Sequence, residues 1–202
     1  MRLGIFGGTF DPVHYGHLLL AEYCREACAL DKVWFVPAAV APHKQGREHS
    51  PAEHRVAMLK LAIGGHEAFE VCTLETDRGG VNYTFETLEA IRREHPYDEL
   101  FLLLGGDSLA DLPSWREPGR ILELATPVVV SRPGAPPPDW NSLAGFASPD
   151  RLTEFAKHLV VLPQIGISGT DLRRRVSDGK SIRYQTLRAV EMYIKEQGLY
   201  RS

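Results

Sequence analysis

The 202-residue sequence has few cysteines, no excess of positive charge and no long apolar run. Its three cysteines are an odd number without CxxC spacing, so we expect no disulfide framework. The formal net charge of -3 argues against a nucleic-acid-binding surface, because such surfaces carry a basic excess. No apolar run approaches the length of a membrane span, and the start MRLGIF turns polar at once, so we expect neither a membrane segment nor a signal peptide. These absences predict a cytoplasmic protein that meets any anionic ligand with a local cluster of charge.

Two of the cysteines, Cys24 and Cys28, lie four residues apart within a predicted helix. That spacing would suit a redox pair or half of a metal site. Burial among apolar side chains explains it more simply, because a free cysteine behaves as a small apolar residue. We therefore expect both thiols to be buried and reduced.

Short apolar runs alternate with longer segments of helical periodicity along the chain. Runs such as FLLL and VVV are apolar continuously, which is typical of parallel strands covered on both faces. We predict strands at residues 3–6, 33–37, 69–74, 100–104, 127–130 and 159–162. We predict helices at residues 18–28, 51–63, 84–95, 116–124, 168–177 and about 185–197.

This order of elements predicts an α/β fold, a doubly wound parallel sheet of Rossmann-like type with helices closing the chain. Length and the absence of a repeat favour a single domain over residues 1–202. Ser50, Pro51 and Glu53 predict the start of the second helix, as N-cap, first-turn proline and third-position carboxylate. The proline-rich stretch 132–140 is predicted to be an exposed, stiff loop. Ligands of such a sheet bind at the carboxyl ends of its strands.

Residues 6–18 read FGGTFDPVHYGHL and follow the first predicted strand. Glycines in this place let the main chain approach a phosphate, and the helix after them offers amides and the positive end of its dipole. The stretch lacks the GK[ST] and GxGxxG patterns of common nucleotide sites. It has HxGH instead, which puts His14 and His17 on one side of a first helical turn. Two imidazoles there can donate hydrogen bonds to phosphoryl oxygens as charge builds during a transfer reaction.

Two other interpretations compete with phosphate binding at this motif. The histidines could be helix caps or surface residues, but the strand, the paired glycines and the helix all stand in register with a phosphate site. Zinc could take His14 and His17 with Asp11 and His43, but neither HExxH nor CxxC accompanies them. We therefore expect phosphate binding and no metal held by protein ligands alone.

The segment GISGTDLRRRVSDGKSIRY at 166–184 follows the last predicted strand. Ser168 suits an N-cap with Asp171 three residues later, so part of the motif is a capping box. The same helix carries three consecutive arginines in a chain of net negative charge. A helix N-terminus with guanidinium groups is a phosphate site, and a triphosphate needs about that much compensation. Arg173 lies one turn from the cap and can face it, whereas Arg174 and Arg175 are expected to turn away into solvent.

Together, GGTFDPVHYGH and ISGTDLR resemble the nucleotidyltransferase superfamily that bears HxGH near its first strand and ISxTxxR near its last. Within that superfamily the whole chain resembles the bacterial nicotinate-nucleotide adenylyltransferases. The stretches that carry this resemblance run from end to end: PAAVAPHK at 37–44, VNYTFETL at 81–88, LLGGDSLADLPSW at 103–115, VVVSRPG at 128–134 and GKSIRY at 179–184.

The resemblance implies transfer of the adenylyl group of ATP to nicotinate mononucleotide, giving nicotinate adenine dinucleotide and pyrophosphate. The attack on the α-phosphorus is in line and forms no covalent enzyme intermediate. Mg²⁺ is implied as a companion of ATP, bridging phosphates with water completing its shell, because no carboxylate cluster suggests an all-protein site. The implied partners are thus ATP and nicotinate mononucleotide, with no nucleic acid or membrane, and the oligomeric state stays open.

The same resemblance implies catalytic and ATP-binding residues at both motifs. His14, His17 and Arg173 form the implied catalytic set, with His17 stabilising the α-phosphoryl transition state. Gly105 and Asp107 of GGD meet the adenosine ribose, although Asp107 could also be a helix N-cap. The other implied ATP contacts are the cradle of Gly7, Gly8, Thr9 and Phe10, Ile167 near the adenine, and Ser168 and Thr170 at the β and γ phosphates.

For nicotinate mononucleotide the resemblance implies His43 and Lys44 at the phosphate, Trp115 stacked on the ring and Thr84 at its carboxylate. Without the family, Trp115 could equally be a core aromatic residue and Lys44 a solvated surface charge. Asn82 stands where the family often has serine, which leaves the preference for the acid over the amide nucleotide open. The competing functions are an adenylyltransferase for nicotinamide mononucleotide or phosphopantetheine, and a module that binds adenylates without chemistry.

Overall fold

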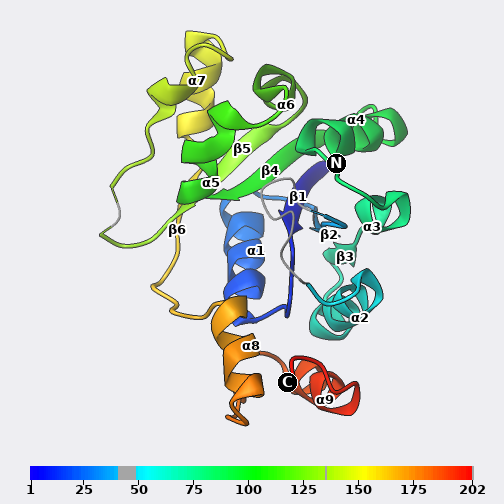
Figure 1. Ribbon diagram of the computed structural model, residues 1–202. Helices are drawn as coiled ribbons and strands as arrows, with labels where there is room; N and C mark the ends of the chain where they lie inside the picture. Colours follow the sequence, from blue (N-terminus) through cyan, green and yellow to red (C-terminus); the bar gives the residue numbers. More distant parts are fainter. Residues whose placement is uncertain (41–48, 135, 202) are drawn as a thin grey trace.

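The computed structural model describes residues 1–40, 49–134 and 136–201. Its centre is one sheet of six parallel strands in the order β3-β2-β1-β4-β5-β6 (Figure 1). The chain winds outward from β1 in one direction and then returns to wind outward in the other, which confirms the predicted doubly wound Rossmann-like fold. The strands are β1 (Arg2–Gly8), β2 (Lys32–Pro37), β3 (Phe69–Val71), β4 (Glu99–Gly105), β5 (Thr126–Ser131) and β6 (Leu159–Val161).

All six predicted strands form, and the third is shorter than predicted. The predicted strand 69–74 ends at Val71, because the chain turns there into the short helix α3 (Leu74–Arg78). Only one neighbour pairs with this edge strand, since Val33, Trp34 and Phe35 of β2 supply its hydrogen-bonded register. A strand at the edge of a sheet has no second partner to extend it.

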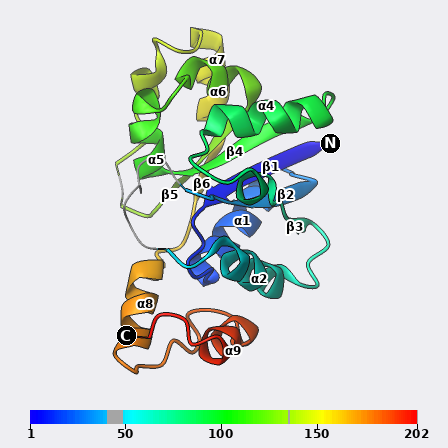
Figure 2. The same ribbon diagram turned by 45° about the vertical axis from the view of Figure 1, so that its right-hand side comes forward.

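Helices cover both faces of the sheet, as Figure 2 shows from a second side. One face carries α1 (Tyr15–Ala27) and α2 (Ala52–Ile63), with α8 (Gly169–Ser177) and α9 (Arg188–Glu196) beyond them, and α9 packs on α2. The other face is covered by α4, α5, α6 and α7 together with two short 3₁₀ turns. These elements are α4 (Thr84–Glu94), α5 (Gly106–Asp111), η2 (Leu112–Ser114), α6 (Pro118–Leu124), η3 (Trp140–Leu143) and α7 (Pro149–Ala156).

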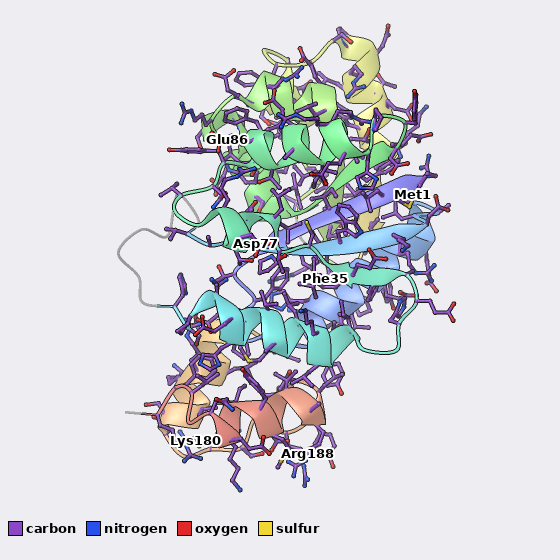
Figure 3. All side chains as sticks on the ribbon, turned by 90° about the vertical axis from the view of Figure 1, so that its right-hand side faces the viewer. Met1, Phe35, Asp77, Glu86, Lys180 and Arg188 are labelled. Carbon is purple, nitrogen blue, oxygen red and sulfur yellow. The ribbon has the colours of Figure 1, made fainter. Side chains whose placement is uncertain are left out.

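Two apolar cores follow from this arrangement, one on each face. Successive residues of β4 alternate between them: Leu102 packs with the α4–α7 core, and Phe101 and Leu103 pack with the core under α1 and α2. Because both faces are covered, every second residue is as buried as its neighbour, which explains the unbroken FLLL and VVV runs. Phe35 of β2 belongs to the core beneath α2 (Figure 3).

Three predicted helix starts need correction. Ser50 does not cap α2, because Pro51 occupies the N-cap position. The Ser50 amide donates to the Asp11 carboxylate. The first helix begins at Tyr15 rather than residue 18, so HxGH straddles its first turn. The helix predicted at 116–124 begins at Pro118, since Glu117 before it adopts a left-handed conformation with φ 54°.

The cysteine and membrane predictions can also be compared with the described residues. Cys24 and Cys28 are buried in the core under α1, as predicted, and burial raises the pKa of the Cys24 thiol to about 12. The described part of 132–140 is largely exposed. Within the described residues no helix is long and apolar enough to cross a membrane.

Candidate active site

The loop between β1 and α1 is shaped by a buried aromatic cluster. Phe10 follows the glycines with φ 50°, and only 1% of its surface is exposed. Its ring centroid lies 5.3 Å from that of Phe6 and 5.0 Å from that of His17. A Cβ at Gly8 would stand 2.8 Å from the Phe10 ring, so a side chain at position 8 would displace it. Phe10 therefore anchors the loop, and only its main chain remains for a ligand.

His14 and His17 lie face to face at the start of α1. Their ring centroids are 3.7 Å apart with an interplanar angle of 22°. The His14 main-chain amide donates to Nδ1 of His17 at 3.3 Å, which assigns the proton of a neutral His17 ring to Nε2. The simpler interpretation is thus partly right, because His17 does satisfy an amide at the helix start. The same bond leaves Nε2–H as the donor of that ring.

The His14 side chain is buried, and its environment is electrostatically unusual. The ring is 6% exposed, and burial lowers the pKa of His14 from its ordinary 6.5 to about 4. Its Nδ1 has no hydrogen-bond partner among the residues that the structure describes. A Cβ at Gly16 would stand 3.0 Å from that nitrogen, so glycine between the histidines is what lets the His14 ring fold back over the helix start. A buried, unsatisfied ring nitrogen beside a helix N-terminus is suited to an anionic ligand that supplies the missing partner.

The second motif touches the first one directly. Arg173 donates from Nη1 to the main-chain oxygen of Asp11 at 2.6 Å and from Nη2 to Thr170 Oγ1 at 3.4 Å. A Cβ at Gly169 would stand 3.0 Å from the same Asp11 oxygen. The structure therefore brings residues 11–16 and 167–173, more than 150 positions apart in sequence, to one end of the sheet. The helices α1 and α8 both begin there.

The start of α8 follows the sequence prediction closely. Ser168 is the N-cap, and its Oγ accepts the Asp171 amide at 3.1 Å. Arg174 is exposed and pairs with Asp171, as expected for a residue that turns away. Arg175 differs from its prediction, because it is half-buried and donates from Nε to the Ser181 carbonyl at 2.9 Å. That bond holds the turn after α8.

Asp11 joins the loop to three other parts of the chain. The residue is 4% exposed, and its carboxylate accepts hydrogen bonds from the Tyr200 hydroxyl and the Ser50 amide. Burial works to raise the pKa of Asp11, but the bonds from Tyr200 and Ser50 and the charge of Arg173 outweigh it and lower that pKa below its ordinary value. These bonds connect Asp11 to distant segments of the chain, a role that the sequence pattern, in which it was only a candidate zinc ligand, did not predict.

Arg55 of α2 is the buried cation that organises the loops around Asp11. It is 2% exposed and donates to the main-chain oxygens of Thr9 at 3.0 Å, Ala38 at 2.7 Å, Ser50 at 2.9 Å and Ala39 at 3.4 Å. Sequence reasoning missed this residue. A signal was present, because Arg55 lies three and four residues before Met58 and Leu59, on the buried face of its helix.

A cavity of about 820 Å³ opens where β1, β2 and β4 end, on the face covered by α4 and α5. We call it the main cavity. Trp115 lines it and also packs on the adjoining core, so its interpretation as a core aromatic residue is supported, and its side chain also reaches the cavity. Asn82 lines it as well, but its amide donates to the carbonyls of Gly79 and Gly80 at 3.1 Å, which makes it a tie within its own loop. Other lining residues are Gly7, Gly8, Thr9, Glu75, Thr84, Gly105, Ser108, Asp111 and Arg116.

Comparison with known proteins fits this geometry. A cytidylyltransferase-like family model matches residues 5–175. A probable nicotinate-nucleotide adenylyltransferase of Roseiflexus sp. is 50% identical over 201 residues, which cover 98% of each chain. One of Thermomicrobium roseum is 47% identical over 202 residues, covering 100% of this chain and 92% of the relative. The chain belongs to the nicotinate-nucleotide adenylyltransferase family.

Solved structures agree on the fold of this family. A Plasmodium falciparum nicotinic acid mononucleotide adenylyltransferase complexed with NaAD matches with a TM-score of 0.75 at 17% identity, covering 98% of this chain and 97% of that one. A putative nicotinate-nucleotide adenylyltransferase from Vibrio parahaemolyticus matches with a TM-score of 0.69 at 19% identity, covering 100% and 97%. At these identities the likeness concerns the arrangement of the strands and helices.

The remaining sequence-predicted residues of this family member stand as follows. Gly105 is the N-cap of α5, so Asp107 is not a cap but an exposed residue in the first turn, outside the lining of the main cavity. Ile167 lies beside the HxGH turn, with its carbonyl 3.9 Å from where a Cβ at Gly16 would be. His43 and Lys44 lie outside the described residues. Within the described ranges, no three His, Cys, Asp or Glu side chains gather into a group that could hold a metal ion.

Burial of His14 predicts a pH dependence of stability. The unfolded chain binds the imidazole proton near pH 6.5 and the folded protein only near pH 4, so this residue's contribution is fully present above pH 6.5 and is lost as the pH falls toward 4. The loss amounts to about 3 kcal/mol. The unfolding free energy, measured with urea at several pH values between 7 and 4.5, should fall less steeply with decreasing pH in His14→Asn than in the unsubstituted protein. His158→Asn, next to the edge strand β6, is the control. An unchanged pH dependence of the unfolding free energy in His14→Asn would contradict the prediction.

The bond from Tyr200 to Asp11 predicts a second stability effect. Tyr200→Phe removes only the hydroxyl and leaves a buried carboxylate short of one donor, which should cost about 1–3 kcal/mol of unfolding free energy at pH 7. The matched control is Tyr184→Phe, because Tyr184 is 84% exposed. Equal urea midpoints for the two variants would show that the C-terminal tyrosine does not hold the loop.

Proposed function

We propose that this protein transfers the adenylyl group of ATP to nicotinate mononucleotide, giving nicotinate adenine dinucleotide and pyrophosphate. The observation that carries the proposal is the direct contact between the two phosphate-directed motifs, made by Arg173 on the Asp11 carbonyl. Two helix N-termini and a pair of stacked imidazoles meet there, and the main cavity adjoins them at Gly7, Gly8 and Thr9. Relatives at 45–50% identity over nearly the whole chain carry the name of this activity.

The proposed reaction needs positioning and charge compensation rather than a protein nucleophile. An oxygen of the mononucleotide phosphate attacks the α-phosphorus of ATP, a new P–O bond forms, and the bond to the bridging oxygen of the β-phosphate breaks. Pyrophosphate leaves with that electron pair. Negative charge grows on the oxygens around the α-phosphorus, and donors that already point there stabilise it without rearranging.

Each motif has a distinct proposed part in that stabilisation. His17, fixed as the Nε2–H tautomer by the His14 amide, donates to an α-phosphoryl oxygen. His14 gives its unsatisfied ring nitrogen to the phosphates, whose charge favours the protonated ring. Arg173, Ser168 and Thr170 hold the β and γ phosphates from the other side, with the amides at the start of α8.

For the acceptor nucleotide we propose the main cavity. Trp115 offers an aromatic wall for the pyridine ring, and Thr84 is the first residue of α4, where the N-terminus of the helix would attract the carboxylate of the ring. The residues present suit a Mg²⁺ ion that is bound mainly by the substrate. The Asp11 carboxylate already accepts two hydrogen bonds, and the described residues offer no cluster of carboxylates. Mg²⁺ would then arrive on the triphosphate, held by phosphate oxygens and water, and neutralise part of its charge.

The proposed activity is tested by mixing the purified protein with ATP, Mg²⁺ and one acceptor, and following pyrophosphate release. Release with nicotinate mononucleotide is expected, with a lower kcat/KM for nicotinamide mononucleotide and none for phosphopantetheine. If either of the other acceptors gave a higher kcat/KM than nicotinate mononucleotide, that acceptor would be the substrate instead. Nucleotide binding without release from any of the three would leave an adenylate-binding module.

His17→Ala should lower kcat by two or more orders of magnitude, because a donor that acts on developing charge costs about 3 kcal/mol when removed. ATP affinity, measured by calorimetry, should change much less. His158→Ala is the matched control, since that imidazole lies before β6 at the far edge of the sheet. Equal losses in kcat and in ATP affinity would mean that His17 only binds the nucleotide.

A further inference from the structure

Arg116 is the one cationic side chain among the described residues that line the main cavity. It follows Trp115 directly and is exposed at the start of the segment that leads to α6. The acidic residues in the same lining are Glu75 and Asp111. Glu75 is occupied, because the Thr87 hydroxyl donates to it at 2.7 Å.

The Arg116 guanidinium is held in place by aromatic stacking rather than by an ion pair. Its central carbon lies 4.6 Å from the centroid of the Tyr83 ring and 5.9 Å from that of Phe85. A cation–π contact uses the charge of the group and none of its N–H hydrogen bonds, so its donors stay available for a ligand.

Neighbouring arginines of the same region are paired, which sets Arg116 apart. Arg120 lies 2.8 Å from the Glu89 carboxylate, and Arg78 lies 3.9 Å from that of Glu86. In the described part of the chain, Arg116 has no carboxylate partner and no hydrogen bond. It is thus a cation at the wall of a cavity, and its hydrogen-bonding capacity is unused among the described residues.

The groups around Arg116 define what it can recognise. Tyr83, on which it stacks, is the N-cap of α4, and Thr84 is the first residue of that helix. The cavity therefore brings together an aromatic wall, a helix N-terminus and a guanidinium group. A flat ring that bears a negative substituent matches all three features.

We propose that Arg116 is a specificity-determining residue that makes the protein prefer a carboxylate to a carboxamide on the pyridine ring of the acceptor. This inference rests on the proposed function and names the group that selects its substrate. A carboxylate accepts two parallel N–H bonds from a guanidinium and neutralises its charge. A carboxamide is uncharged, and its NH₂ group would face a side chain that has donors only.

The test compares kcat/KM for nicotinate and nicotinamide mononucleotides in Arg116→Gln, Arg116→Lys and the unsubstituted protein. Arg116→Gln should lower the value for the acid roughly 10- to 100-fold and change the value for the amide less than about threefold, so the acid-to-amide ratio collapses. Arg116→Lys keeps the charge without the planar fork and should recover part of the ratio. The KM for ATP should be unchanged throughout.

Arg93→Gln is the matched control, because Arg93 is exposed on the last turn of α4, outside the cavity lining, and its loss changes net charge equally. Equal losses for both acceptors in Arg116→Gln would overturn the proposal, since both carry the same phosphate and only the ring substituent differs. An unchanged ratio would also overturn it. If the unsubstituted protein turned over neither mononucleotide, the proposed function would fail instead, which is a distinct result.

Discussion

The bond from Arg173 to the main-chain oxygen of Asp11 is the contact on which the architecture of the site depends. It joins the first loop of the fold to a helix that begins more than 150 residues later. The Asp11 carboxylate reaches in other directions, to Tyr200 near the C-terminus and to Ser50 before α2. A single residue thus receives hydrogen bonds from three distant segments. Movement of the HxGH turn relative to α8 would have to break that joint.

The buried polar groups near this contact are of two kinds: charged groups that have partners, and a ring nitrogen that has none among the described residues. Asp11 and Arg55 are both buried. Burial lowers the pKa of Arg55 and the charge of Asp11 opposes that shift, while hydrogen bonds from Tyr200 and Ser50 and the charge of Arg173 keep the pKa of Asp11 low. The HxGH turn is different, because His14 has been taken out of water without a partner for Nδ1 among the described residues. In a chain of net charge -3, favourable potential for an anion is therefore local. It comes from helix N-termini, ring N–H groups and one arginine rather than from a basic surface.

The sequence predicted the layers of this fold because continuous apolar runs and helical periodicity report burial on both faces of a sheet. It placed Ser50 at the cap of α2, whereas Pro51 takes that position and Ser50 is bound to Asp11, a residue 39 positions away. It also assigned Arg175 to solvent, although a carbonyl six residues later holds it. These errors share one cause: a long-range or turn-specific partner competes with the local preference, and local pattern carries no record of that partner.

The candidate site shows the same division. Both motifs follow predicted strands, so HxGH and the start of α8 were expected to lie close together. The contacts between residues 11–16 and 167–173 confirm this. Arg116 was missed, because nothing in the sequence distinguishes an arginine in contact with the Tyr83 ring from a solvated one. Arg55, which donates to four carbonyls, was missed as well. Only the position of Arg55 on an apolar helix face hinted at its burial.

The carbonyls that surround Arg55 explain why an arginine occupies that apolar face. The loops after β1 and β2 meet at this side chain, because the main-chain oxygens of Thr9, Ala38, Ala39 and Ser50 all accept hydrogen bonds from the Arg55 guanidinium. Buried carbonyls without donors are costly, and a lysine or a leucine at position 55 could not reach four of them. A planar group with five N–H donors can, and it uses four bonds here. The loops that surround the HxGH turn are thus held from α2, whose Arg55 donates to four of their carbonyls.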